Sequence, residues 1–90
     1  KSDTAGRWGG EEFLIVAPQT SCDNAVAFAE KLRLSIENTE FSSGVRVSAS
    51  FGVASLETGE TIQLVLKRAD EALYRAKHNG RNRVETRINL

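Results

Sequence analysis

The run Phe13-Leu14-Ile15-Val16-Ala17 constrains the fold most strongly, because five consecutive apolar residues are ended by Pro18. Its short length and its β-branched residues favour a strand that is buried on both faces over a helix. A strand of this kind needs neighbouring strands on both of its edges. We therefore expect a sheet of several strands with residues 13–17 inside it.

The glycine pair Gly9-Gly10 lies directly before this strand and directly after residues 4–8. Paired glycines between two extended segments predict a tight hairpin, because glycine adopts positive φ without a steric penalty. We therefore expect a β-hairpin that bends at Gly9-Gly10.

Two helices and two further strands are predicted after the hairpin. Residues 20–38 start with a helix-capping pattern and then place apolar side chains at helical spacing, with charged residues such as Arg33 expected on the solvent-exposed side. Residues 45–53 alternate with a period of two, which is typical of a half-buried strand. A second helix is expected from a Thr61 cap to Gly80, and residues 84–88 alternate again. The order predicts an α/β fold, an α+β sandwich in which helices flank a mostly antiparallel sheet.

The predicted elements do not make a complete sandwich. Two helices and a few strands leave little to cover both helix faces and both edges of the strand at residues 13–17. We expect that an N-terminal strand and helices, missing from this chain, supply that cover. Residues 1–90 are therefore interpreted as the C-terminal part of a single domain.

Composition narrows the possible partners. The chain has 12 basic and 12 acidic residues, so it has no overall basic field for nucleic acid, and its few aromatic residues disfavour a small RNA-binding domain. Cys22 is the single cysteine, which excludes an internal disulfide and fits a reducing compartment. No apolar run approaches the roughly 18 residues that cross a bilayer. We expect a cytoplasmic chain that meets a membrane only through other domains.

Two carboxylates follow the glycine pair and give the chain its first candidate site. Exposed glycines allow a polyphosphate to approach the backbone, but Glu11 and Glu12 would repel it unless a divalent cation lay between them. Magnesium suits this arrangement, because it is held by one or two carboxylates together with substrate phosphates. Glu11 is the stronger candidate ligand, and Glu12, expected on the opposite face, a supplementary one. The alternative is a charged turn with two solvated glutamates.

The end of the second predicted helix holds the other candidate site. Lys77 and Arg81 can clamp a phosphate, the lysine as a point charge and the arginine as a planar fork. The alternative is that these cations only satisfy the last carbonyl groups and the dipole of the helix.

Three blocks of sequence resemble the GGDEF domain of diguanylate cyclases. Residues 7–13, Arg-Trp-Gly-Gly-Glu-Glu-Phe, resemble the family signature, in which a glycine pair is followed by Asp or Glu, then Glu and Phe. Residues 47–54 and residues 67–82 resemble two later blocks in the family's order. The resemblance covers the chain from Asp3 to about Arg83.

The resemblance implies a palm-like fold related to nucleotidyl cyclases and polymerases. It implies that two GTP molecules condense to cyclic di-GMP with release of pyrophosphate, in a homodimer whose half-sites each present one GTP. Mg²⁺, or Mn²⁺, is the implied cofactor, with Glu11 and Glu12 as metal-binding and catalytic residues. Gly9 and Gly10 match the turn that contacts the substrate, and Lys77 and Arg81 match the phosphate contacts.

The resemblance also implies regulation. Asp3 matches the aspartate of the family's inhibitory motif, and Lys31 lies near a position where some members bind inhibitory cyclic di-GMP. An N-terminal sensor or regulatory domain is expected in the parent protein. The family's earlier aspartate ligand and guanine-binding residues have no counterpart here, so we expect the isolated chain to be inactive. The alternative is a catalytically silent GGDEF-like module that binds nucleotide or a partner.

Overall fold

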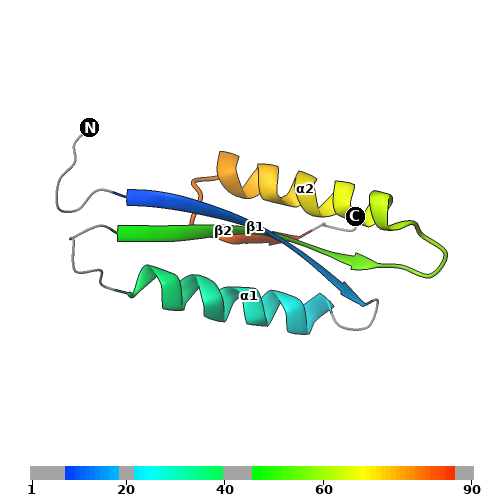
Figure 1. Ribbon diagram of the computed structural model, residues 1–90, viewed down its shortest axis with the longest axis horizontal. Coiled ribbons are helices and arrows are strands. Elements are labelled where there is room, and N and C mark those ends of the chain that lie inside the picture. The colour runs from blue at the N-terminus through cyan, green and yellow to red at the C-terminus, as the bar shows by residue number, and fades with distance from the viewer. Residues whose placement is uncertain (1–7, 19–21, 40–45, 87–90) are drawn as a thin grey trace.

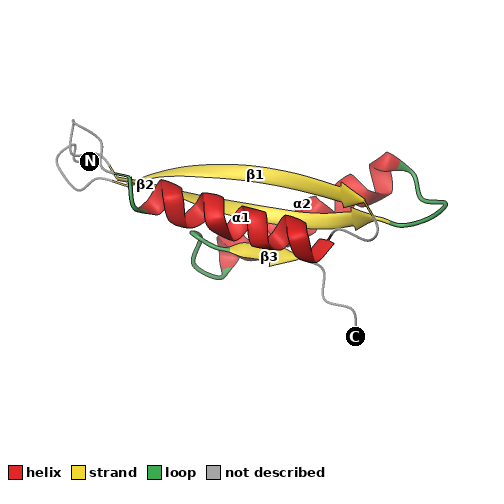
Figure 2. Ribbon diagram, turned by 90° about the horizontal axis from the view of Figure 1, so that it is seen from below, coloured by secondary structure: helices red, strands yellow, loops and turns green. Residues whose placement is uncertain are grey.

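The structure is a computed structural model that describes residues 8–18, 22–39 and 46–86. Two helices enclose one sheet, with α1 against one face and α2 against the other (Figure 1; Figure 2). The strand order in the sheet is β1-β2-β3. Along the chain the elements are β1 (Trp8–Pro18), α1 (Cys22–Glu37), β2 (Arg46–Leu56), α2 (Ile62–His78) and β3 (Val84–Thr86).

The three described strands are all parallel. β1 pairs with β2 from Trp8↔Arg46 to Pro18↔Leu56, and β2 pairs with β3 from Phe51↔Val84 to Val53↔Thr86. The α/β class is confirmed, but the mostly antiparallel sheet was a wrong expectation. A helix separates each strand from the next and carries the chain back across the sheet, so the next strand starts at the same end and runs in the same direction.

The glycine pair lies inside β1, where Gly9 is opposite Val47 and Gly10 is opposite Ser48. The expected hairpin bend at these residues is therefore wrong, because pairing with β2 continues straight through them. The described glycines with positive φ are instead Gly59 and Gly80. Residues 4–7, expected to form the first hairpin strand, lie outside the described residues.

β2 is the central strand and is covered on both faces, not on one face as expected. Its apolar residues Ala49, Phe51 and Val53 are at most 1% exposed and pack against α1. The opposite face carries small side chains, which allow α2 to come very close. A Cβ added to Gly52 would collide with the backbone of Ala69 and lie 2.9 Å from Leu73 Cβ. Both faces of β2 are therefore buried. The alternation in the sequence reflects apolar side chains on the face toward α1 and small side chains on the face toward α2.

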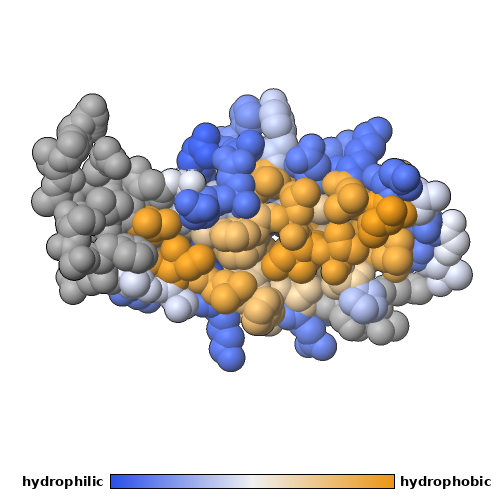
Figure 3. Space-filling view, in the orientation of Figure 1, coloured by the Kyte–Doolittle hydropathy of each residue, from blue (hydrophilic) through white to orange (hydrophobic). Residues whose placement is uncertain are grey.

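β1 is an edge strand in the sheet, whereas the sequence predicted a strand buried on both faces. Phe13 is 41% exposed and Leu14 is 43% exposed, although Phe13 also stacks on Phe51 at a centroid distance of 5.1 Å. A band of apolar side chains follows β1 between the two helices (Figure 3). A run of apolar residues indicates that burial of the strand is favourable. The order of the strands in the sheet decides whether neighbouring elements are present to bury it.

Both ends of α2 agree with the sequence. Thr61 caps its first turn by accepting a hydrogen bond from the Leu64 N–H at 3.2 Å. At the other end the Arg81 N–H donates to the Ala76 carbonyl at 2.8 Å, across Gly80 at φ +115. This is the Schellman arrangement that glycine permits, and it fixes the direction in which the chain leaves the helix.

The turn before α2 is held by Arg68, which is only 8% exposed. Its guanidinium donates to both carboxylate oxygens of Glu60 and to the Ser55 carbonyl at 2.7 Å. The hydrogen bond to Glu60 raises the pKa of Arg68 above its ordinary value, against an opposing effect of burial. The bidentate pair fastens α2 to the turn before it, and the bond to Ser55 fastens α2 to the end of β2.

Candidate functional site

Glu11 and Glu12 lie on opposite faces of β1, as adjacent residues of a strand must. Further along the strand, Ile15 packs in the cluster next to α1 and Val16 packs in the cluster next to α2. Glu11 therefore shares the α1 face, and Glu12 shares the α2 face. Both side chains are exposed, and Glu11 has no polar partner among the described residues. The two carboxylates are thus available for different tasks.

Glu12 meets both cations that the sequence singled out. Lys77 Nζ lies 3.4 Å from Glu12 Oε1, and Arg81 Nη1 lies 3.5 Å from Glu12 Oε2. The structure therefore brings together a residue in the middle of β1 and residues at the end of α2 and in the loop that follows it, about 65 positions away in the chain. Two positive groups and one carboxylate leave a net positive charge at this place, which suits an anionic ligand.

These two ion pairs are weak. The side chains of Glu12, Lys77 and Arg81 are 43%, 31% and 57% exposed, respectively. Exposed pairs of this kind contribute about 0–1 kcal/mol, because water screens them and the side chains lose entropy. A phosphate group with several charged oxygens can therefore replace the Glu12 carboxylate at Lys77 and Arg81.

Gly10 leaves the backbone of β1 open beside this cluster. A Cβ added to Gly10 would have nothing within 4 Å, and Gly10 has the same strand parity as Glu12. An incoming group can therefore approach the backbone here without meeting a side chain. This open position is what the expected substrate-contacting role of the glycine pair requires at Gly10.

Arg81 owes its position to an unusual backbone. Arg81 has φ 61 and Asn82 has φ 48, and both lie in the left-handed region. Each such residue costs about 1–2 kcal/mol unless its surroundings hold it, although asparagine tolerates the region better than arginine. The Asn82 N–H donates to Ser50 Oγ at 3.0 Å, and its side chain bonds to α1. The loop after α2 is therefore anchored to the central strand and to α1.

The sequence did not identify the residues of α1 that hold this loop. Arg33 was expected on the wet side of the helix, yet its side chain is only 16% exposed and contacts Asn82. The sequence feature that could have indicated this contact was Asn82 itself. An asparagine after Gly80-Arg81 is typical of a left-handed backbone, and its side chain then needs hydrogen-bond partners. Its partners lie more than 40 positions away, and no local pattern identifies them.

The carboxylates fit a divalent cation only in part. Across residues 8–18, 22–39 and 46–86 there is no group of three or more His, Cys, Asp or Glu side chains that could hold a metal. A carboxylate oxygen is the type of ligand that Mg²⁺ takes. Glu11 can offer one without losing a partner in this part of the chain, whereas Glu12 is engaged by two cations and faces the other way.

The expected inhibitory site is described in part. Lys31 lies exposed on α1, and Asp3 lies outside the described residues. No helix in the part of the chain that the structure describes is both long and apolar enough to span a membrane.

Comparison with known proteins supports the resemblance seen in the motifs. The family model of the diguanylate cyclase GGDEF domain matches residues 1–83. The chain is 48% identical over 84 residues to the diguanylate cyclase DgcM of Escherichia coli, covering 93% of this chain and 20% of that protein. It is 42% identical over 87 residues to diguanylate cyclase A of Treponema denticola, covering 92% and 24%.

The response regulator PleD of Caulobacter vibrioides is 39% identical over 88 residues, covering 91% of this chain and 19% of that protein. The chain therefore spans about a fifth of the length of the curated relatives it matches. No solved structure matches it. Since the family model covers nearly the whole sequence, the chain belongs to the GGDEF family of diguanylate cyclase domains.

Proposed function

We propose that this chain is the C-terminal part of a single GGDEF domain that condenses two GTP molecules to cyclic di-GMP. The observation that carries the proposal is the meeting of Glu12, Lys77 and Arg81 beside the open backbone at Gly10. A solvent-accessible pair of cations with a replaceable carboxylate suits a triphosphate, and the family match makes GTP the triphosphate to test.

Each of two reaction steps forms one phosphodiester bond. The 3′-hydroxyl of one GTP attacks the α-phosphorus of the other, its proton passes to a base, and the bond to the β-phosphate oxygen breaks to release pyrophosphate. A homodimer in which each subunit presents one GTP would supply the proximity that this reaction needs. Bound Mg²⁺ or Mn²⁺ would neutralise charge on the phosphates.

The residues divide these tasks, and because β1 is an edge strand, side chains from both of its faces can reach a nucleotide bound at its open edge. Glu11, unpaired among the described residues, binds the cation and is the candidate base for the 3′-hydroxyl. Lys77 and Arg81 bind phosphate oxygens, and Gly9 and Gly10 allow the phosphates to approach β1. Glu12 pairs with Lys77 and Arg81 when no nucleotide is present, and would be free to serve as a supplementary metal ligand if phosphate replaced it there.

Glu11→Gln tests this assignment in the complete protein that carries the chain. We expect loss of cyclic di-GMP synthesis by about 100-fold or more, because an amide neither binds the cation as strongly nor accepts the proton. Product is measured by chromatography after incubation with GTP and Mg²⁺. Asp70→Asn, an exposed acid on α2, is the control that retains activity. Normal synthesis by Glu11→Gln would show that the role of Glu11 is wrong.

A second function, nucleotide binding without catalysis, is favoured by one observation. Within the described ranges, fewer than three potential acidic, His or Cys ligands gather in one place. In that case the complete protein would bind GTP through Lys77 and Arg81 and form no cyclic di-GMP. Equilibrium binding measured beside product formation separates the two functions.

Feedback inhibition through Asp3 and Lys31 is a further part of the proposal. The exposed position of Lys31 on α1 allows it to contact a ligand from solvent. In the complete protein, added cyclic di-GMP would then reduce GTP turnover, and Lys31→Ala would weaken the inhibition.

A further inference from the structure

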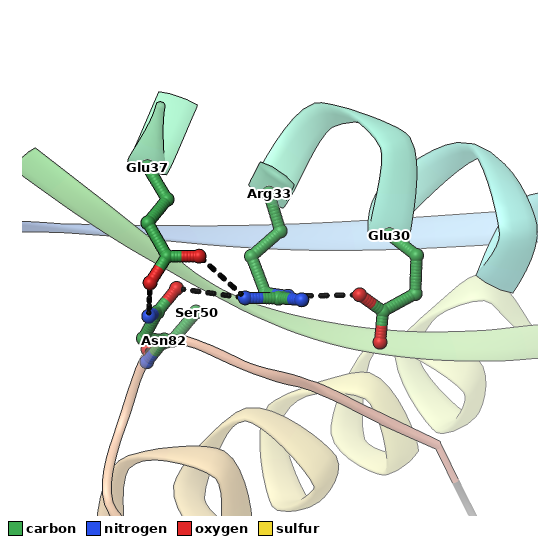
Figure 4. Close-up of polar contacts among 5 residues, drawn as sticks. All are labelled: Glu30, Arg33, Glu37, Ser50 and Asn82. Atoms are coloured by element: carbon green, nitrogen blue, oxygen red, sulfur yellow. Dashed lines mark hydrogen bonds and ion pairs between the residues drawn. The ribbon is translucent and has the colours of Figure 1, made fainter. Parts of the chain in front are cut away.

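The loop that carries Arg81 is tied to α1 by a closed ring of three side chains, which we call the loop clamp: Arg33, Glu37 and Asn82 (Figure 4). Arg33 Nη1 donates to Asn82 Oδ1 at 3.1 Å, and Asn82 Nδ2 donates to Glu37 Oε2 at 2.8 Å. Arg33 Nη1 also lies 3.3 Å from Glu37 Oε1. Each member of the clamp therefore contacts both of the others.

The clamp is anchored more firmly than the cluster around Glu12. The side chains of Arg33 and Glu37 are 16% and 32% exposed, and Glu30 holds the Arg33 Nε–H at 2.8 Å. By contrast, the Arg81 side chain is 57% exposed and lies 3.5 Å from Glu12. Less exposed, multiply bonded pairs resist solvent and side-chain motion better than exposed single pairs do. The clamp therefore holds the loop more firmly than the pairing of Arg81 with Glu12 does.

The backbone connects the clamp to Arg81 directly. Arg81 and Asn82 are consecutive left-handed residues, with φ 61 and φ 48. The side-chain amide of Asn82 is held by α1, and its N–H is held by Ser50 of β2. If the Asn82 amide lost its hydrogen bonds to α1, the Arg81 backbone could leave its unfavourable left-handed conformation. The Arg81 guanidinium would then move away from Glu12.

We infer that Arg33, Glu37 and Asn82 are positioning residues that aim Arg81 at the triphosphate, so that phosphate binding depends on the α1 helix. This inference rests on the proposed function, because it takes Arg81 as a phosphate ligand. The clamp residues are placed to act through the loop backbone, with Arg81 making the contact to the phosphate.

A double-mutant cycle on the complete protein tests the inference. The variants are Arg33→Ala, Arg81→Ala and the double variant, and the probe is a non-hydrolysable GTP analogue with Mg²⁺, measured by calorimetry. We expect Arg81→Ala to weaken binding about 10-fold and Arg33→Ala about 5-fold, the sizes that lost charged and neutral hydrogen bonds produce. In the Arg81→Ala background, Arg33→Ala should have no further effect, because the residue it positions is gone.

A second variant keeps the test independent of folding. Asn82→Gly retains the left-handed backbone and removes the amide contacts to α1, and we expect it to behave as Arg33→Ala does. Arg83→Ala is the matched control on the same loop. Its side chain is 43% exposed, its ion pair among the described residues is with Glu85 at 3.6 Å, and its loss should leave binding unchanged. Steady-state kinetics should show a raised KM for GTP with kcat nearly constant.

The possible outcomes distinguish the proposed role of Arg81 as a phosphate ligand from the inferred positioning role of the loop clamp. If Arg81→Ala leaves GTP binding unchanged, Arg81 is no phosphate ligand, and both the proposed role and the inference are wrong. If Arg81→Ala weakens binding but the losses from Arg33→Ala and Arg81→Ala simply multiply, the proposed role stands and the positioning inference is overturned. The positioning inference is likewise overturned if Asn82→Gly binds the analogue as tightly as the unmodified protein.

Discussion

At the scale of single residues, the neighbours Glu11 and Glu12 are given different chemistry by their position in a strand. Glu12 shares the α2 face and pairs with Lys77 and Arg81, while Glu11 has no polar partner among the described residues. The opposite orientation follows from strand geometry and was predictable from sequence. The partners of Glu12 were not, because they depend on where α2 ends relative to β1.

The contact between Arg81 and phosphate gives a prediction at this scale. Arg81→Ala should raise the KM for GTP by about 10-fold or more, because a charge-assisted hydrogen bond to phosphate is lost. Initial rates of cyclic di-GMP formation over a range of GTP concentrations measure the effect. Arg83→Ala serves as the comparison, since the Arg83 side chain is 43% exposed and its pair with Glu85 is long, at 3.6 Å, so the pair contributes little. Equal KM values for the two variants would contradict a specific role for Arg81.

At the scale of elements, the close contact between β2 and α2 determines where the functional end of α2 lies. The face of β2 toward α2 carries Ser50, Gly52 and Ala54, all at least 97% buried or in direct contact with the helix. Because these side chains are small, α2 packs close to the sheet, and Lys77 comes within reach of Glu12. The size of side chains on one strand thus places charged groups of another element.

Gly52→Ala tests this close packing. The added methyl group would collide with the Ala69 carbonyl oxygen and lie 2.9 Å from Leu73 Cβ, so α2 must move outward. We expect the free energy of unfolding to fall by about 1–3 kcal/mol, the usual cost of overpacking. Thermal or urea unfolding measures this change. Gly10→Ala, which meets nothing within 4 Å, should leave stability nearly unchanged; equal loss in both variants would refute the packing argument.

At the scale of the whole molecule, an exposed apolar band runs along β1, which is the edge strand of the sheet (Figure 3). Phe13 and Leu14 belong to the most apolar run of the sequence, yet each is more than 40% exposed. The chain spans about a fifth of its relatives, and its described residues gather no three-ligand metal group. These facts together support the proposal that the active domain needs more than these 90 residues.

The isolated chain should therefore fail to form cyclic di-GMP. We expect no product above background from the 90-residue chain with GTP and Mg²⁺, because the described residues bring fewer than three metal-binding side chains together, too few to hold and position the cation. The complete protein, assayed under the same conditions, is the positive control. Appreciable turnover by the isolated chain would disprove this requirement.

The sequence by itself determined the motif and much of the local structure, although the hairpin expected at Gly9-Gly10 was wrong. Capping at Thr61, the glycine end of α2 and the helical and alternating periods are properties of a few neighbouring residues, and the structure confirms them. The three family blocks are local as well, so they were sufficient to indicate the GGDEF family, which the family model confirms.

Only the tertiary structure decided strand direction, the edge position of β1 and the partners of Arg33. Periodicity records which side chains avoid water, but parallel or antiparallel pairing depends on how each helix carries the chain across the sheet. For the same reason Phe13 is half-exposed although its run predicts burial, and Arg33 is mostly buried although its helix position predicts exposure. Both depend on residues far away in the chain, and local spacing carries no information about them.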